Sequence, residues 1–120
     1  MSRLLTPAEL EIMTALWDLD EGTVREVLLR LEGERAVTTV STLVRILEQK
    51  GFVRSRKSGR QHLYRAAIPR QAYQRASLRD LLRRVFGGDA SALLRSLVSA
   101  AEVGPEEIAE LRRLLEEKKR

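Results

Sequence analysis

Five cationic side chains are crowded into one short segment near the middle of the chain. They lie within residues 54–65, a segment that contains no Asp or Glu: Arg54, Arg56, Lys57, Arg60 and Arg65. Guanidinium groups bind phosphates and base edges through two parallel hydrogen bonds, and Arg supplies 18 of the 22 cations in the chain. Because surfaces built for solubility mix both signs of charge, this segment indicates a surface that binds a polyanion.

The charge distribution of the whole chain points to the same region. The 120 residues carry a net charge of +5, but residues 35–75 hold ten cations and a single acid, Glu48. Residues 1–34 have a net charge of −5 and residues 76–120 a net charge of +1. Nucleic acid is therefore the first partner to consider.

A second set of polar groups lies just before the basic segment, on a predicted helix. On a wheel of 100° per residue, Val40, Leu43, Val44 and Leu47 share the apolar side of residues 38–50. The opposite side and its flank carry Thr38, Thr39, Ser41, Thr42, Arg45 and Gln49. Hydroxyl, amide and guanidinium groups at these positions suit base edges and phosphates. We therefore predict DNA contacts from these six residues and from Arg54, Arg56, Lys57 and Arg60.

Most other chemistry is excluded by composition. The chain has no Cys and one His, His62, so no disulfide, thiolate metal site or Cys nucleophile is expected. There is no phosphate-binding loop. We predict no catalytic residues, no metal and no cofactor, and hence a protein that is not an enzyme. Without a long apolar run or a signal peptide, we expect a cytoplasmic protein that does not insert into membranes.

The elements that position these residues follow from capping signals and periodicity. Thr6 precedes Pro7 and a helix that should end near Asp18, and Thr23 precedes a short helix that should end near Leu31. Thr38 or Thr39 is expected to cap a third helix, which Gly51 stops, after a possible short strand at residues 36–37. After Gly51 the helical repeat ends, and residues 52–56 and 62–66 are predicted to form the two strands of a hairpin. This order is typical of a winged helix-turn-helix, in which the third helix enters the major groove.

Three further amphipathic segments follow Pro69. They are predicted to be helical, within residues 70–86, from 89 or 91 onward, and from 105 onward. Their apolar stripes comprise Leu78, Leu81, Leu82, Val85, Leu93, Leu94, Leu97, Ile108, Leu111 and Leu115. A segment this small seldom buries such stripes alone, so we predict that a second copy covers them. The fold class is thus mainly α with a small β-hairpin: a winged helix-turn-helix over residues 1–69, followed by a helical dimerisation domain over residues 70–120.

Several of these segments together resemble one known family. They are the segment from Thr6 to Trp17, residues 39–51, the hairpin that ends at Tyr64, residues 86–89 and residues 106–111. The chain is similar to the BlaI/MecI penicillinase repressors over nearly its whole length. The resemblance implies a homodimeric winged-helix repressor that binds an inverted repeat in promoters, often those of β-lactam resistance genes.

The resemblance also bears on individual residues. The family's DNA-contacting helix corresponds to Thr38, Thr39, Ser41, Thr42 and Arg45, in agreement with the wheel. Family members are released from DNA when a membrane-bound sensor metalloprotease triggers cleavage of an Asn-Phe bond. That bond aligns with Ser96 and Leu97, where the residue types differ, so the release step stays open. The copper-responsive relatives have a Cys-rich tail, which this chain lacks.

An alternative function remains open. The same charges would serve a winged-helix module that docks on an acidic protein and reads no base sequence. Binders of RNA or single strands stack bases on exposed aromatic rings. In residues 35–66 only Phe52 and Tyr64 are aromatic, and the hairpin needs both for packing. Duplex DNA is therefore favoured over those nucleic acids.

Overall fold

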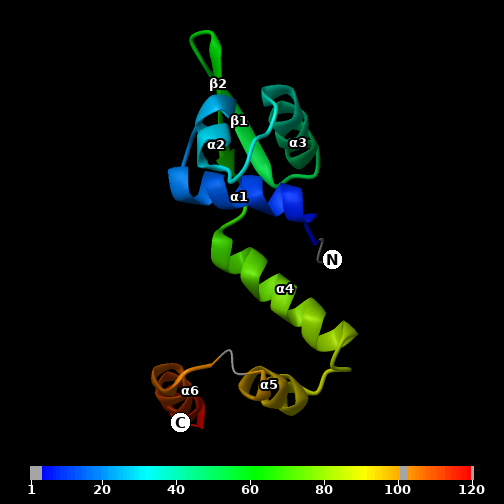
Figure 1. Ribbon diagram of the computed structural model, residues 1–120, viewed down its shortest axis with the longest axis vertical. Helices are drawn as coiled ribbons and strands as arrows, with labels where there is room; N and C mark the ends of the chain where they lie inside the picture. The colour runs from blue at the N-terminus through cyan, green and yellow to red at the C-terminus, as the bar shows by residue number, and fades with distance from the viewer. Residues whose placement is uncertain (1–3, 101–102, 120) are drawn as a thin grey trace. The chain divides into compact units, whose positions relative to one another are not determined.

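The computed structural model describes residues 4–100 and 103–119, which form helices and one two-stranded sheet (Figure 1). In chain order the elements are α1 (Pro7–Leu19), α2 (Val24–Arg30), α3 (Val37–Gln49), β1 (Val53–Ser58), β2 (Gln61–Ala66), α4 (Arg70–Arg84), α5 (Ala90–Ser99) and α6 (Pro105–Lys119). The mainly α fold with a winged helix-turn-helix is confirmed. The chain divides into two compact units after Ser77.

The first two helices begin as their sequences predict. The Thr6 N–H donates to Glu9 Oε1 at 2.9 Å and the Glu9 N–H donates to Thr6 Oγ1 at 3.2 Å. Thr23 and Glu26 form the same reciprocal pair at 2.9 and 3.2 Å. Each capping box satisfies two backbone donors that a helix start would leave unpaired, so both starts are defined locally.

The start of α3 differs from the prediction. Ala36 is the N-cap and makes no side-chain cap, while Thr38 and Thr39 lie inside the first turn. The helix begins early because the Ala36 carbonyl already accepts the Val40 N–H at 3.2 Å. The prediction that Thr38 or Thr39 caps this helix was therefore wrong, as was the short strand at residues 36–37.

A residue outside residues 36–37, Gly22, pairs with the hairpin instead. Gly22, next to the cap of α2, forms an antiparallel bridge with Tyr64, and their backbone N–H groups donate to each other's carbonyls at 2.9 and 2.8 Å. A Cβ at Gly22 would lie 3.0 Å from Leu19 Cδ1, so a larger residue here would require that leucine side chain to shift by a few tenths of an ångström. The bridge joins the segment before α2 to the sheet.

The hairpin itself is longer than predicted. Pairing runs from Val53 opposite Ala66 to Ser58 opposite Gln61, which leaves a two-residue turn at 59–60. Gly59 has a φ of 63°, in the region that glycine adopts without steric cost. The strands therefore continue through residues that sequence alone assigned to the loop.

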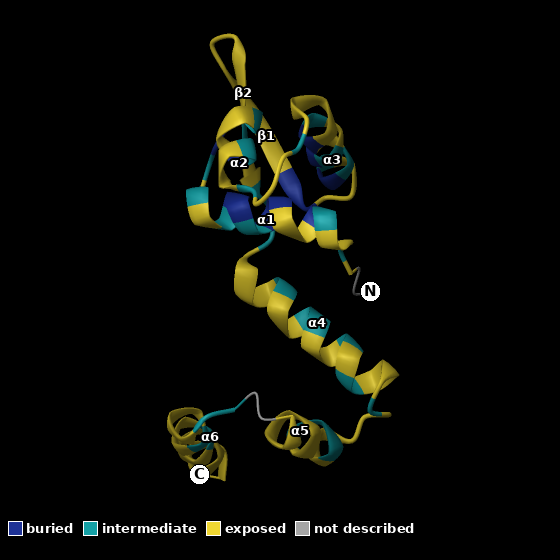
Figure 2. Cartoon of the chain, viewed as in Figure 1, coloured by how far each residue is buried: buried dark blue, intermediate teal, exposed yellow. Residues whose placement is uncertain are grey.

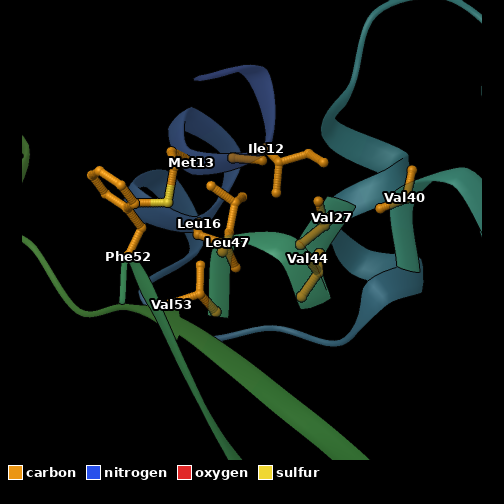
Figure 3. Packing of buried hydrophobic residues seen from close by; sticks show 10 residues of the cluster. Ile12, Met13, Leu16, Val27, Val40, Val44, Leu47, Phe52 and Val53 are labelled. Atoms are coloured by element: carbon orange, nitrogen blue, oxygen red, sulfur yellow. The ribbon is translucent and has the colours of Figure 1, made fainter. Parts of the chain in front are cut away.

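One hydrophobic core holds the first unit together (Figure 3). Buried side chains from α1, α2 and α3 meet the first residues of the wing: Ile12, Met13, Ala15, Leu16, Val27, Val40, Val44, Leu47, Phe52 and Val53. Trp17 is half-buried and packs against this cluster. Because α3 and β1 share this core, the helix and the hairpin are fixed relative to each other.

The first unit extends beyond the predicted domain boundary at Pro69. The Leu5 N–H donates to Tyr73 Oη at 3.0 Å, and the Tyr73 ring lies 6.0 Å from that of Trp17. Trp17 Nε1 donates to the Ile68 carbonyl at 2.9 Å. The beginning of α4 thus packs on α1, and the compact unit ends after Ser77 rather than at residue 69.

The second unit has well-defined helix ends but little interior. Gly87 and Gly88, with φ of 58° and 84°, follow α4, and the Ala92 N–H donates to Asp89 Oδ1 at 3.1 Å to cap α5. None of the described residues of α4, α5 and α6 is buried, as the yellow and teal ribbon of Figure 2 shows. No helix within the described ranges is long and apolar enough to cross a membrane.

Candidate nucleic-acid interface

Helix α3 presents one side to the core and the other to solvent. Val40, Val44 and Leu47 are fully buried, while Leu43 is half-buried. Of the predicted contact residues, Ser41 is half-buried and five are exposed: Thr38, Thr39, Thr42, Arg45 and Gln49. The helical wheel therefore separated the two sides correctly, with Ser41 and Leu43 at the margins.

The hydroxyl group of Thr42 is already engaged. Thr42 Oγ1 donates to the Thr38 carbonyl at 2.9 Å, one turn earlier in the same helix. This bond uses the only proton of the hydroxyl. Outward contacts from Thr42 are thus limited to its γ-methyl group and to an oxygen that accepts.

Two carboxylates fix the C-terminal end of α3. Glu9, buried in α1, accepts from Lys50 Nζ at 2.7 Å, directly after α3. Glu48 Oε2, on α3, accepts from the Ser55 hydroxyl of β1 at 2.5 Å. These contacts tie α3 to α1 on one side and to the wing on the other.

The environment of Glu9 favours its charged form. Burial raises the pKa of this carboxyl, but hydrogen bonds from Lys50 and the Thr6 N–H, together with the positive charge of Lys50, outweigh burial and hold the pKa below its ordinary value of 4.5. Glu9 is therefore ionised near neutral pH, and its contacts stabilise the fold.

The wing cations are exposed but do not all share one face. Arg54 lies opposite Arg65 and Arg56 opposite Leu63, which places the three arginines on one face of the hairpin. Lys57 belongs to the other face, and Arg60 is in the turn. Like charges directly opposite each other destabilise a sheet. The Arg54–Arg65 pair is thus unfavourable for folding and suited to binding an anion.

One wing cation already has a partner. Arg56 Nε and Nη2 donate to the two carboxylate oxygens of Glu21 at 2.8 and 2.7 Å. The hydrogen bond from Arg56 lowers the pKa of Glu21, aided by the charges of Arg56 and Arg65, and Glu21 in turn raises the pKa of Arg56. Within residues 4–100 and 103–119, no such ion pair occupies Arg45, Arg54, Lys57 or Arg60.

Sequence reasoning missed the acids that orient this surface. Glu21 and Arg56 are 35 residues apart and Glu9 and Lys50 are 41 apart. No local spacing pairs residues at such separations. Among the acids near this surface, only Glu48, which accepts from Ser55, stands out in the sequence, because it is the only acid in residues 35–75.

Nearly the whole chain matches a known family of proteins. The family model described as the penicillinase repressor matches residues 5–117. The chain belongs to the penicillinase repressor family. It is therefore a DNA-binding transcriptional repressor, as the resemblance implied, and the family is not one of enzymes.

Relatives of this penicillinase-repressor family member are similar along most of their length. The Penicillinase repressor of Staphylococcus aureus is 24% identical over 113 residues, 92% of this chain and 90% of that protein. The Methicillin resistance regulatory protein MecI of Mammaliicoccus sciuri is 22% identical over 116 residues, 95% and 94% of the two chains. An uncharacterized 16.5 kDa protein of Latilactobacillus sakei is 27% identical over 92% of this chain and 77% of its own length.

A solved structure has the same fold as this family member. It is the organohalide sensing RdhR-CbdbA1625 transcriptional regulator in its 2,4-dichlorophenol bound form, with a TM-score of 0.52 and 20% identity. The match covers 96% of this chain but only 63% of that regulator. At this identity the likeness extends to the fold alone.

Proposed function

We propose that the protein represses transcription as a homodimer that reads an inverted repeat in duplex DNA. Each protomer places α3 in the major groove, where Thr38, Thr39, Thr42, Arg45 and Gln49 face base edges and phosphates. Ser41, half-buried, contributes from the margin. The observation that carries this proposal is the exposed polar side of α3, fixed by one core beside an exposed cationic hairpin.

The wing is proposed to bind the sugar-phosphate backbone. Arg54, Lys57 and Arg60 are exposed without ion-pair partners among the described residues, so their charges are available to phosphates. Arg56, held by Glu21, is better placed to fix the hairpin against the segment before α2. We therefore modify its predicted role from phosphate contact to wing positioning.

Dimerisation is supported by the apolar surface of the second unit. Large apolar side chains there are exposed: Leu78, Leu81, Val85, Leu97, Val98, Leu114 and Leu115. Leu82, Leu93, Leu94, Ile108 and Leu111 are half-buried. A monomeric soluble protein seldom leaves so many such groups uncovered, and a second copy of the same stripes is self-complementary under two-fold symmetry.

The regulated genes and the release step are inferred from the family. Relatives named Penicillinase repressor and Methicillin resistance regulatory protein support control of β-lactam resistance or related stress genes. Release by a sensor metalloprotease system would cut between Ser96 and Leu97, both exposed in α5. Leu97 is also a proposed dimer contact. A protease would therefore reach this bond only after the two protomers separate at α5.

Selection from a random duplex library tests the proposal. A dimer that reads bases should return an inverted repeat with half-sites about one helical turn apart. With about three to four phosphate contacts per protomer, the slope of log K against log salt should be roughly −5 to −7. A library that yields no consensus would favour the alternative, a winged-helix module that docks on an acidic protein.

A further inference from the structure

The first turns of α3 expose an apolar hollow among their hydroxyl groups. It is shallow, with a volume of about 280 Å³, and is lined by Thr38, Thr39, Thr42 and Leu43. Each threonine carries a γ-methyl group, and Leu43 is half-buried. Val37, the first residue of the helix, is 42% exposed and adds apolar surface to the same turn. This part of α3 therefore offers more apolar than hydrogen-bonding surface.

The bond made by Thr42 strengthens this conclusion. Because its hydroxyl donates to the Thr38 carbonyl, Thr42 has no proton left to give to a base or a phosphate. The same bond holds the side chain in one orientation. Thr42 therefore suits a partner with an apolar group at the contact point.

Among the groups in the major groove of DNA, one is apolar. The C5-methyl of thymine distinguishes A·T and T·A pairs, and threonine methyl groups are among its common protein contacts. A phosphate or a hydrogen-bonding base edge would gain little from a hollow of methyl groups and leucine. The chemistry of the hollow thus selects one feature of one base.

We propose that this hollow reads the C5-methyl group of a thymine in each half-site, with Thr42 as the specificity-determining residue. The inference rests on the proposed function, since it requires α3 in the major groove. It assigns α3 two kinds of reading: apolar contact in its first turns and hydrogen bonding by Arg45, one turn further on.

Deoxyuridine substitution tests the inference, because uracil differs from thymine only by the methyl group. In the operator obtained by selection, thymines are replaced one symmetric pair at a time, and binding is measured by fluorescence anisotropy with the full-length protein. Loss of one methyl contact is expected to weaken binding about fourfold per half-site, or about 15-fold for the pair. Thymines elsewhere in the operator, replaced in the same way, are the control and should change affinity less than about twofold.

Two variants of one side chain separate the methyl from the hydroxyl. Thr42→Val keeps a methyl group and loses the hydroxyl, so it should retain the preference for thymine over uracil. Thr42→Ser keeps the hydroxyl and loses the methyl, so it should bind the thymine operator several-fold more weakly and lose most of that preference. Circular dichroism of both variants checks that α3 still folds.

Several results would overturn the inference. They are an operator without a thymine in the half-site, no thymine pair whose methyl affects binding, or a thymine preference in Thr42→Ser equal to that of the wild type. Loss of affinity in Thr42→Val, with none in Thr42→Ser, would assign the contact to the hydroxyl instead. These outcomes refute the methyl contact while leaving repression by DNA binding intact. A selection without consensus would overturn both.

Discussion

Replacing Glu9 by Gln should destabilise the unit that carries the interface. Glu9 is 3% exposed and joins the start of α1 to the residue that follows α3. Glutamine preserves the shape and still accepts from the Thr6 N–H, so the capping box survives. What it removes is the negative charge facing Lys50.

The cost follows from the geometry of that contact. Hydrogen bonds to charged groups contribute about 1.5–3 kcal/mol, and the bond between Lys50 Nζ and Glu9 Oε2 is 2.7 Å long. Lys50 is 38% exposed and regains water when its partner is lost, which places the expected loss near the lower limit, at about 1.5 kcal/mol. For a unit of this size, the melting temperature should fall by about 6–12 °C.

The pH dependence provides an independent measure of the same contact. The pKa of Glu9 is lower in the folded chain than its ordinary value of 4.5, so ionised Glu9 stabilises the fold above that pH. This contribution is lost as the pH falls below 4.5 and through the lower folded pKa. The stability difference between wild type and Glu9→Gln should therefore narrow steadily from pH 5 toward pH 3.

Urea unfolding at several pH values measures both effects. The fluorescence of Trp17, the single tryptophan, reports on this unit because the ring packs against its core. Glu11→Gln is the matched control: it removes the more exposed Arg35–Glu11 pair, with 2.8 Å between Nη2 and Oε2, and should cost less than about 0.5 kcal/mol. A Glu9→Gln protein as stable as wild type at pH 7, or a difference unchanged at pH 3, would refute the reasoning.

Three further predictions concern binding and assembly. Arg60→Ala should reduce the magnitude of the salt slope by about 0.9 per protomer in anisotropy titrations, whereas Arg56→Ala should change it less because Glu21 already neutralises Arg56; equal slope changes would contradict the positioning role. Arg45→Ala should weaken operator binding by about 1–3 kcal/mol and alter the consensus in a repeated selection, and an unchanged consensus would argue against base contact. Val85→Asp, at a position 67% exposed directly after α4, should convert a dimer into a monomer of 13.7 kDa by light scattering; a wild-type monomer at micromolar concentration would remove the dimer proposal.

The accuracy of the sequence predictions varied with the range of the interactions involved. The starts of α1 and α2 were correct because a capping box needs only residues three apart. The start of α3 was wrong because two threonines offered caps, and the helix instead began at Val37 without one. The short strand predicted at residues 36–37 was also wrong. The residue that does pair with the hairpin is Gly22, opposite Tyr64, and no local sequence pattern marks it because the two residues are far apart in the chain.

Sequence alone indicated the surface that is proposed to bind DNA. The acid-free cations of residues 54–65 and the polar side of α3 are local patterns, since charge and periodicity are properties of neighbouring residues. What each of these groups can contact depends on the tertiary structure. Arg56 is held by Glu21, and Glu9 holds Lys50, because folding brought together residues far apart in the chain. Thr42, whose hydroxyl is bound to its own helix, offers a methyl group where composition alone had indicated a donor.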